Sequence, residues 1–165
     1  MEDTLSSGLL SAEALAKIDR ELTKYPTDRR QAAVMSALRI AQAEKGWLSK
    51  ETIAFVADYL GIPAIAALEV ASFYNMYELE PVGKYKLTVC TNISCMLRDS
   101  DVIVEHLQQK LGIGFNETTA DGKFTLKEGE CMGCCAGAPL LHVNNHRMCE
   151  YLTPEKVDAL LEELK

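Results

Sequence analysis

The chain has 165 residues, of which 48% are hydrophobic and 25% are charged, so it is long and apolar enough for one domain or two small ones. Its formal net charge of −7 repels nucleic-acid phosphates and anionic lipid surfaces, which argues against nucleic-acid binding. No uncharged apolar stretch reaches the roughly 18 residues of a membrane-spanning helix, and the acidic N-terminus does not resemble a signal peptide. We therefore expect a cytoplasmic protein without direct membrane insertion.

The first half of the chain has the pattern of a helical bundle. Apolar residues recur there at helical spacing in four successive windows, each bounded by a capping residue or by a helix-ending glycine or proline. The expected bounds are Ser11 to Pro26, about 29 to 45, Ser49 to Gly61, and Pro63 onward. Because the connections are short, these helices predict an antiparallel N-terminal bundle over residues 1–80.

After residue 80 the pattern changes to short strands mixed with helices. The segment Tyr85 to Cys90 alternates apolar and polar residues and predicts a β-strand. The later predicted elements are a helix at about 100–110 with Val102, Ile103 and Leu107 inward, strands at about 123–127 and 140–143, a reversal at Asn144-Asn145, and a final helix after Thr153. This order is of the α/β type and predicts a second domain, residues 81–165, with helices packed on a sheet.

All the cysteines lie in the second half: Cys90, Cys95, Cys131, Cys134, Cys135 and Cys149. In a reducing compartment, clustered thiols indicate metal binding or redox chemistry rather than structural disulfides. Cys90 and Cys95 have four residues between them, and a second group comprises Cys131, Cys134 and Cys135. Two such loops suit either a structural zinc ion or a two-iron cluster. The wide first spacing favours the cluster, and the second group leaves Cys134 and Cys135 as alternative ligands.

The segments that carry these cysteines are uncharged. Neither 87–97 nor 131–145 contains Asp, Glu, Lys or Arg. A two-iron cluster on four thiolates is itself anionic, so nearby carboxylates would oppose its reduction. The lack of charge fits such a centre, and it fits ordinary buried loops equally well.

These motifs together resemble a family of thioredoxin-like [2Fe–2S] ferredoxins, the E subunits of NADH–quinone oxidoreductase (respiratory complex I). The resemblance extends from about residue 12 to residue 165. It rests on the spacing Cys90-x4-Cys95 and Cys131-x3-Cys135, on Ala138-Pro139, and on the segments 46–47, 60–63, 70–74, 122–126 and 152–155.

The resemblance implies a thioredoxin-like C-terminal domain and one [2Fe–2S] cluster ligated by Cys90, Cys95, Cys131 and Cys135. Cys134 occupies a position that the family does not use as a ligand. The resemblance also implies a partner flavoprotein that carries FMN and oxidises NADH, within the peripheral arm of complex I at the cytoplasmic face of the inner membrane. The chain would then be an electron-transfer component of an oxidoreductase, with no catalytic residue or substrate site of its own.

Other functions remain open from the sequence. The same module occurs within the wider family beside the flavoproteins of NAD-linked formate dehydrogenases and hydrogenases. A zinc-stabilised interaction module is an alternative of another class. A dithiol oxidoreductase using Cys131 and Cys134 is a third, although the Ala-Gly-Ala-Pro run before residue 140 is a poor helix start for activating a thiol.

The remaining polar residues suggest no further chemistry. No nucleophile–base pair, phosphate-binding glycine loop or pair of catalytic carboxylates is recognisable, so NADH and FMN should bind elsewhere. We assign no metal to the histidines and no role to Cys149. The histidines are His106, His142 and His146. The aromatic stretch 73–77 suits either a partner surface or internal packing.

Overall fold

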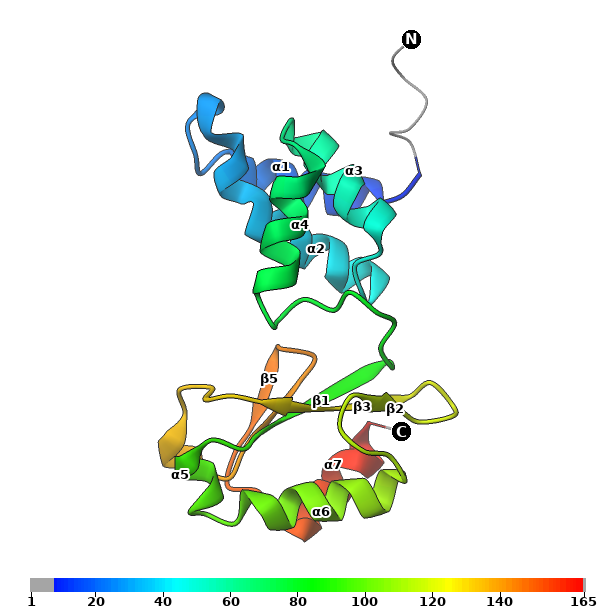
Figure 1. Ribbon diagram of the computed structural model, residues 1–165, viewed down its shortest axis with the longest axis vertical. Helices are drawn as coiled ribbons and strands as arrows, with labels where there is room; N and C mark the ends of the chain where they lie inside the picture. The colour runs from blue at the N-terminus through cyan, green and yellow to red at the C-terminus, as the bar shows by residue number, and fades with distance from the viewer. Residues whose placement is uncertain (1–7, 165) are drawn as a thin grey trace. The chain divides into compact units, whose positions relative to one another are not determined.

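The computed structural model describes residues 8–164. The chain divides into two compact units, one ending at Pro81 and the other beginning at Val82. Figure 1 shows that the first unit is made of helices and that the second contains the sheet. Among the described residues, no helix is long and apolar enough to cross a membrane.

The helical unit follows the capping residues seen in the sequence. Its elements are α1 (Ala12–Leu22), the 3-10 helix η1 (Thr27–Ala33), α2 (Val34–Lys45), α3 (Lys50–Leu60) and α4 (Ala64–Phe73). The Ser11 and Ser49 hydroxyls accept hydrogen bonds from the first turns of α1 and α3. Gly61 ends α3 with a positive φ of 68°, a conformation that glycine adopts without strain.

The core of this unit combines branched side chains with alanines. Ile18, Leu38 and Val56 are fully buried, and the small side chains of α2 and α4 allow the helices to approach closely. These buried alanines are Ala37, Ala41, Ala67 and Ala71. Beyond α4, the buried Tyr77 donates a hydrogen bond to the Met35 carbonyl at 2.8 Å, so this tyrosine belongs to the core.

The second helix begins later than predicted. The expected start near residue 29 is wrong, because Arg29 has non-helical backbone angles (φ −120°, ψ 33°) and regular helix begins at Val34. The reason for the later start is a contact with another helix. The Arg30 side chain donates to the carbonyls of Leu60 (3.1 Å) and Tyr59 (2.8 Å), which lack helical partners at the end of α3.

The second unit is built on a mixed sheet with the order β2-β3-β1-β4-β5. Its strands are β1 (Tyr85–Cys90), β2 (Glu117–Thr118), β3 (Phe124–Gly129), β4 (Leu141–Val143) and β5 (Arg147–Cys149). Its helices are α5 (Ile93–Met96), α6 (Ser100–Leu111), the 3-10 helix η2 (Cys135–Gly137) and α7 (Pro154–Glu163). Strands β1 and β3 are parallel, and the other neighbouring strands are antiparallel. The predicted α/β class is confirmed.

One face of the sheet carries the core of this unit. Leu87, Val89 and Leu126 are fully buried there and pack in one cluster with Leu107 of α6 and Val157 of α7. Both helices lie on the same side of the sheet (Figure 1). Burying each such aliphatic side chain contributes about 1.5–3 kcal/mol. The sheet is therefore held in register by its contact with the two helices.

Some predictions for this unit need correction. Val102, predicted to face inward, is 49% exposed, since the buried face of α6 is set by Ile103 and Leu107. The short elements β2, β5 and α5 were not predicted because two to four residues cannot show a periodicity. The Asn144-Asn145 reversal is present, with φ values of 52° and 58°, and it joins β4 to the unpredicted β5.

Candidate metal centre

The two cysteine loops start from adjacent parallel strands. The register of β1 and β3 places Cys90 beside Gly129, the last residue of each strand. One residue further, the Thr91 N–H donates to the Gly129 carbonyl at 3.1 Å. Since the carboxyl ends of parallel strands meet at one edge of a sheet, both loops emerge together at the place where α/β folds commonly carry their chemistry.

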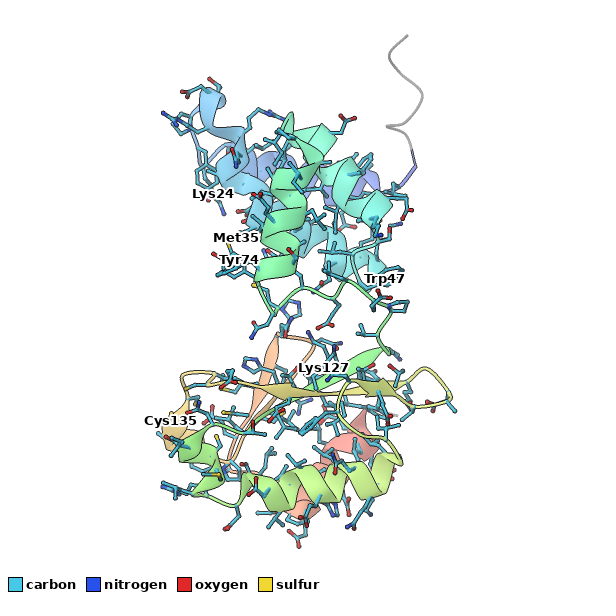
Figure 2. All side chains as sticks on the ribbon, viewed as in Figure 1. Lys24, Met35, Trp47, Tyr74, Lys127 and Cys135 are labelled. Carbon is cyan, nitrogen blue, oxygen red and sulfur yellow. The ribbon has the colours of Figure 1, made fainter. Side chains whose placement is uncertain are left out.

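Pairwise interactions relate the four cysteines of these loops. Cys90 and Cys95 are buried and hydrogen-bonded to each other, and Cys95 also interacts electrostatically with Cys135. The Cys135 and Cys131 sulfurs lie 3.9 Å apart. Figure 2 shows Cys135 beside α5, the helix that carries Cys95. The structure therefore brings Cys90, Cys95, Cys131 and Cys135 to one site.

The chemistry of these donors fits a thiolate-bound metal centre. Metal–thiolate bonds of about 2.3 Å in tetrahedral geometry place two sulfurs on one ion about 3.8 Å apart, close to the separation of Cys131 and Cys135. Burial, assisted by the hydrogen bond to Cys90, raises the pKa of Cys95 to about 11. A bound cation offsets the free-energy cost of burying the Cys95 thiolate. The Leu140 N–H, which donates to the Cys95 sulfur, also favours the thiolate and lowers its pKa.

The arrangement differs from that of a single-ion site. Among residues 8–164, no three His, Cys, Asp or Glu side chains converge as the ligands of one ion. A structural zinc site gathers four ligands around one ion, whereas a two-iron cluster distributes four thiolates over a wider centre.

Cys134 takes part in a different interaction from its neighbour Cys135. Burial, followed by a hydrogen bond to the Glu150 carboxylate, raises the pKa of the Cys134 thiol. The Cys134 side chain is partly buried and packs against four buried side chains, those of Cys90, Cys95, Ala138 and Leu140. Burial and the interaction with Glu150 therefore both disfavour the thiolate form of Cys134.

The uncharged loops do not make an uncharged site. Glu128 accepts a hydrogen bond from the Thr91 hydroxyl at 2.8 Å, and Glu130 accepts one from the Asn92 amide at 3.4 Å. Glu150 contacts the other loop through Cys134. Glu130 directly precedes Cys131 in the sequence, whereas Glu150 is brought to the second loop only by the tertiary structure.

Sequence reasoning also missed an exposed apolar surface at α5. Ile93, Met96 and Leu97 are 66%, 46% and 76% exposed and flank the buried Cys95. The one signal in the sequence was the uncharged segment 87–97, which contains these three residues beyond the end of the predicted strand. Exposed apolar groups of this kind mark interaction surfaces.

The cysteine and histidines that were left without a role have other environments. His106 lies in α6 and pairs with Asp158 at 2.7 Å. His142 lies in β4, where burial lowers its pKa, and His146 is exposed in the following turn. Cys149 lies in β5, where burial raises its pKa. That none of them binds a metal stays a prediction.

Comparison with known proteins identifies the family. Residues 18–165 match the family model of the thioredoxin-like [2Fe–2S] ferredoxins. The chain belongs to this family. The predicted family and its [2Fe–2S] cofactor are thereby confirmed, and the family match extends over most of both units.

Named relatives of this ferredoxin include components of NADH-quinone oxidoreductases. It is 43% identical over 145 residues to the NADH-quinone oxidoreductase E subunit of Rickettsia bellii, an alignment that covers 87% of this chain and 86% of that protein. It is 38% identical over 148 residues to NADH-quinone oxidoreductase subunit 2 of Thermus thermophilus, with 90% of this chain and 82% of that protein covered.

A solved structure shares the fold of this ferredoxin. A chain of an NAD+-reducing [NiFe]-hydrogenase in its H2-reduced state aligns with a TM-score of 0.67 over 82% of this chain, at 21% identity. The alignment covers only 22% of the hydrogenase chain. At this identity the likeness concerns the fold alone.

Proposed function

We propose that the chain is the electron-transfer component of the NADH-oxidising part of an NADH–quinone oxidoreductase and holds one [2Fe–2S] cluster. The observation that supports the proposal is the set of pairwise interactions among Cys90, Cys95, Cys135 and Cys131 at one edge of the sheet. The names of its relatives at 43% and 38% identity support the parent enzyme.

The same four cysteines are the proposed ligands. The 3.9 Å separation of the Cys131 and Cys135 sulfurs supports Cys135 as the second ligand of its loop. The hydrogen bond from Cys134 to Glu150 supports the exclusion of Cys134, because that thiol already has an acceptor. Cys149, in β5, is not a proposed ligand.

The site is arranged for electron transfer rather than for substrate binding. When bound, the cluster stores and releases one electron at a time. Cys90 and Cys95 are buried and shield one side from water, while Cys131 and Cys135 are exposed at the other. The exposed side and the apolar surface of α5 allow a redox partner to approach within electron-transfer range.

The proposed partner is a flavoprotein with FMN and an NADH site, within a larger peripheral arm at the cytoplasmic face of the inner membrane. On the helical unit, α4 is apolar on most of its surface, with Phe73 80% exposed and Ile65 also exposed. We propose this exposed part of α4 as a docking surface. Within the aromatic stretch 73–77, Phe73 therefore belongs to the proposed docking surface and Tyr77 to the core of the helical unit.

A related parent enzyme is the second candidate. The hydrogenase likeness shows that the same fold serves in an NAD+-reducing [NiFe]-hydrogenase. The higher identity to the quinone-enzyme relatives, over most of their length, favours the first candidate. Purification of the native complex distinguishes the two, because a quinone-dependent NADH oxidation supports the first and hydrogen-dependent NAD+ reduction supports the second.

Stopped-flow absorbance tests whether the partner flavoprotein, rather than this chain, oxidises NADH. Mixed with NADH alone, the chain loaded with its cluster should stay oxidised. Addition of the flavoprotein should bring rapid bleaching of the cluster absorbance. Rapid reduction by NADH without the flavoprotein would contradict the proposed role.

A further inference from the structure

The segment 150–153, between β5 and α7, is hydrogen-bonded to the second cysteine loop. The Tyr151 N–H donates to the Gly137 carbonyl at 2.6 Å, and the Leu152 N–H donates to the Pro139 carbonyl at 3.0 Å. The Lys156 ammonium holds the Tyr151 carbonyl at 2.8 Å from the first turn of α7. The backbone of this segment therefore has a fixed position relative to the loop that contains Cys135.

This attachment places the Glu150 carboxylate directly against the loop. Glu150 accepts the hydrogen bond of the Cys134 thiol. It also occupies the space beside the Gly137 Cα, where an added Cβ would clash with its Oε2 atom. Two independent contacts thus locate its charge within two residues of Cys135, although Glu150 is fifteen positions further along the chain.

We infer that Glu150 lowers the reduction potential of the cluster by placing a fixed negative charge beside it, an inference that rests on the proposed function. One-electron reduction converts the all-ferric centre to a ferric–ferrous one and adds one negative charge without making or breaking a bond. Net charge around the centre is one of the main determinants of its potential. A carboxylate held against the ligand loop therefore stabilises the oxidised form relative to the reduced form.

Glu150 is better suited to this role than the other two carboxylates. Glu128 and Glu130 bond to the polar side chains of Thr91 and Asn92 on the first loop. Glu150 instead reaches the second loop through a cysteine adjacent to a proposed ligand, and the glycine at position 137 leaves the space that its carboxylate fills.

The test is a redox titration of the anaerobically purified chain, followed by electron paramagnetic resonance with dithionite as the electron donor. Glu150→Gln keeps the size of the side chain and removes its charge. We expect it to favour reduction about tenfold, which is about 59 mV for a one-electron couple. The matched control is Glu105→Gln on the exposed side of α6, which makes the same charge change away from the loops and should leave the potential unchanged.

A second variant moves the carboxylate without neutralising it. In Gly137→Ala the new Cβ would displace the end of the Glu150 side chain, and the potential should rise by less than in Glu150→Gln. Wild-type potential in Glu150→Gln would overturn the inference. Loss of the cluster from Glu150→Gln would overturn it as well, since Glu150 would then be needed for assembly. A wild-type chain without a cluster would instead refute the proposed function itself.

Discussion

Cys90 and Gly129 are register partners at the last positions of two parallel strands, β1 and β3. This pairing determines the distance between the two cysteine loops, because each loop begins at the next residue. A slip of one residue would move one loop by about 3.3 Å and turn its side chains to the opposite face. The site therefore depends on the sheet core as much as on the cysteines.

The choice between Cys134 and Cys135 can be tested by separate substitutions. Cys135→Ser should lose most of the visible absorbance of the cluster, because a proposed ligand is removed. Cys134→Ser should keep it, since serine can still donate to Glu150. Absorbance and iron content of the two variants, purified in parallel, provide the measurement. The reverse pattern would assign Cys134 as the ligand.

Packing of α6 on the sheet predicts a clear contrast between two of its residues. Leu107→Ala should reduce the free energy of unfolding by about 2–5 kcal/mol, because it creates a cavity at a fully buried position. Val102→Ala should change it by less than about 0.5 kcal/mol, since Val102 is largely exposed. Urea unfolding measured by circular dichroism checks both values. Equal effects would contradict the assigned face of α6.

Arg30 should stabilise the helical unit through the end of α3. Its side chain donates to the carbonyls of Leu60 and Tyr59, so Arg30→Ala should cost about 1–2 kcal/mol of unfolding free energy. Arg29→Ala is the matched control, because its ion pair with Asp28 is exposed. Thermal unfolding should show a lower midpoint for the first variant only. A similar midpoint for both would show that Arg30 does not cap α3.

Tyr59 predicts a pH dependence of stability at high pH. Burial, together with a hydrogen bond to Asp19, raises its pKa to about 12. Its pKa is higher in the folded state than in the unfolded state, where it is about 10. Its contribution is therefore complete below pH 10 and is lost as the pH rises from about 10 to 12.

Comparison with Tyr59→Phe isolates this contribution. The difference in unfolding free energy between the two proteins should be constant from about pH 7 to about pH 9 and should shrink from about pH 10 toward pH 12. Urea titrations at a series of pH values provide the measurement. A difference that does not change over this range would show that Tyr59 does not titrate differently on folding.

The sequence predicted the features that depend on local chemistry. The caps at Ser11 and Ser49, the strand at Tyr85–Cys90 and the helix end at Gly61 all follow from neighbouring residues. The start of α2 was wrong because Arg30 contacts a helix end thirty residues away. Such distant contacts leave no periodic signal in the chain.

In the candidate site, too, the features set by neighbouring residues were predictable and those set by distant contacts were not. The two cysteine groups were recognisable from their spacing alone. Glu130 directly precedes Cys131, but Glu150 was not recognisable, because it reaches its loop only through the folding of the segment before α7. The uncharged segment 87–97 contains the apolar residues of α5, but their exposure could not be predicted, since an apolar residue in a sequence does not reveal whether it faces the core or the solvent.

The central claim is that the four thiols of Cys90, Cys95, Cys131 and Cys135 hold a two-iron cluster. Its most direct test is iron, sulfide and zinc analysis of the anaerobically purified chain, combined with an electron paramagnetic resonance spectrum after dithionite reduction. We predict about two iron and two sulfide per chain and the signal of one reduced [2Fe–2S] centre. A colourless protein that contains zinc, or one that stays free of iron and sulfide after reconstitution, would contradict the claim.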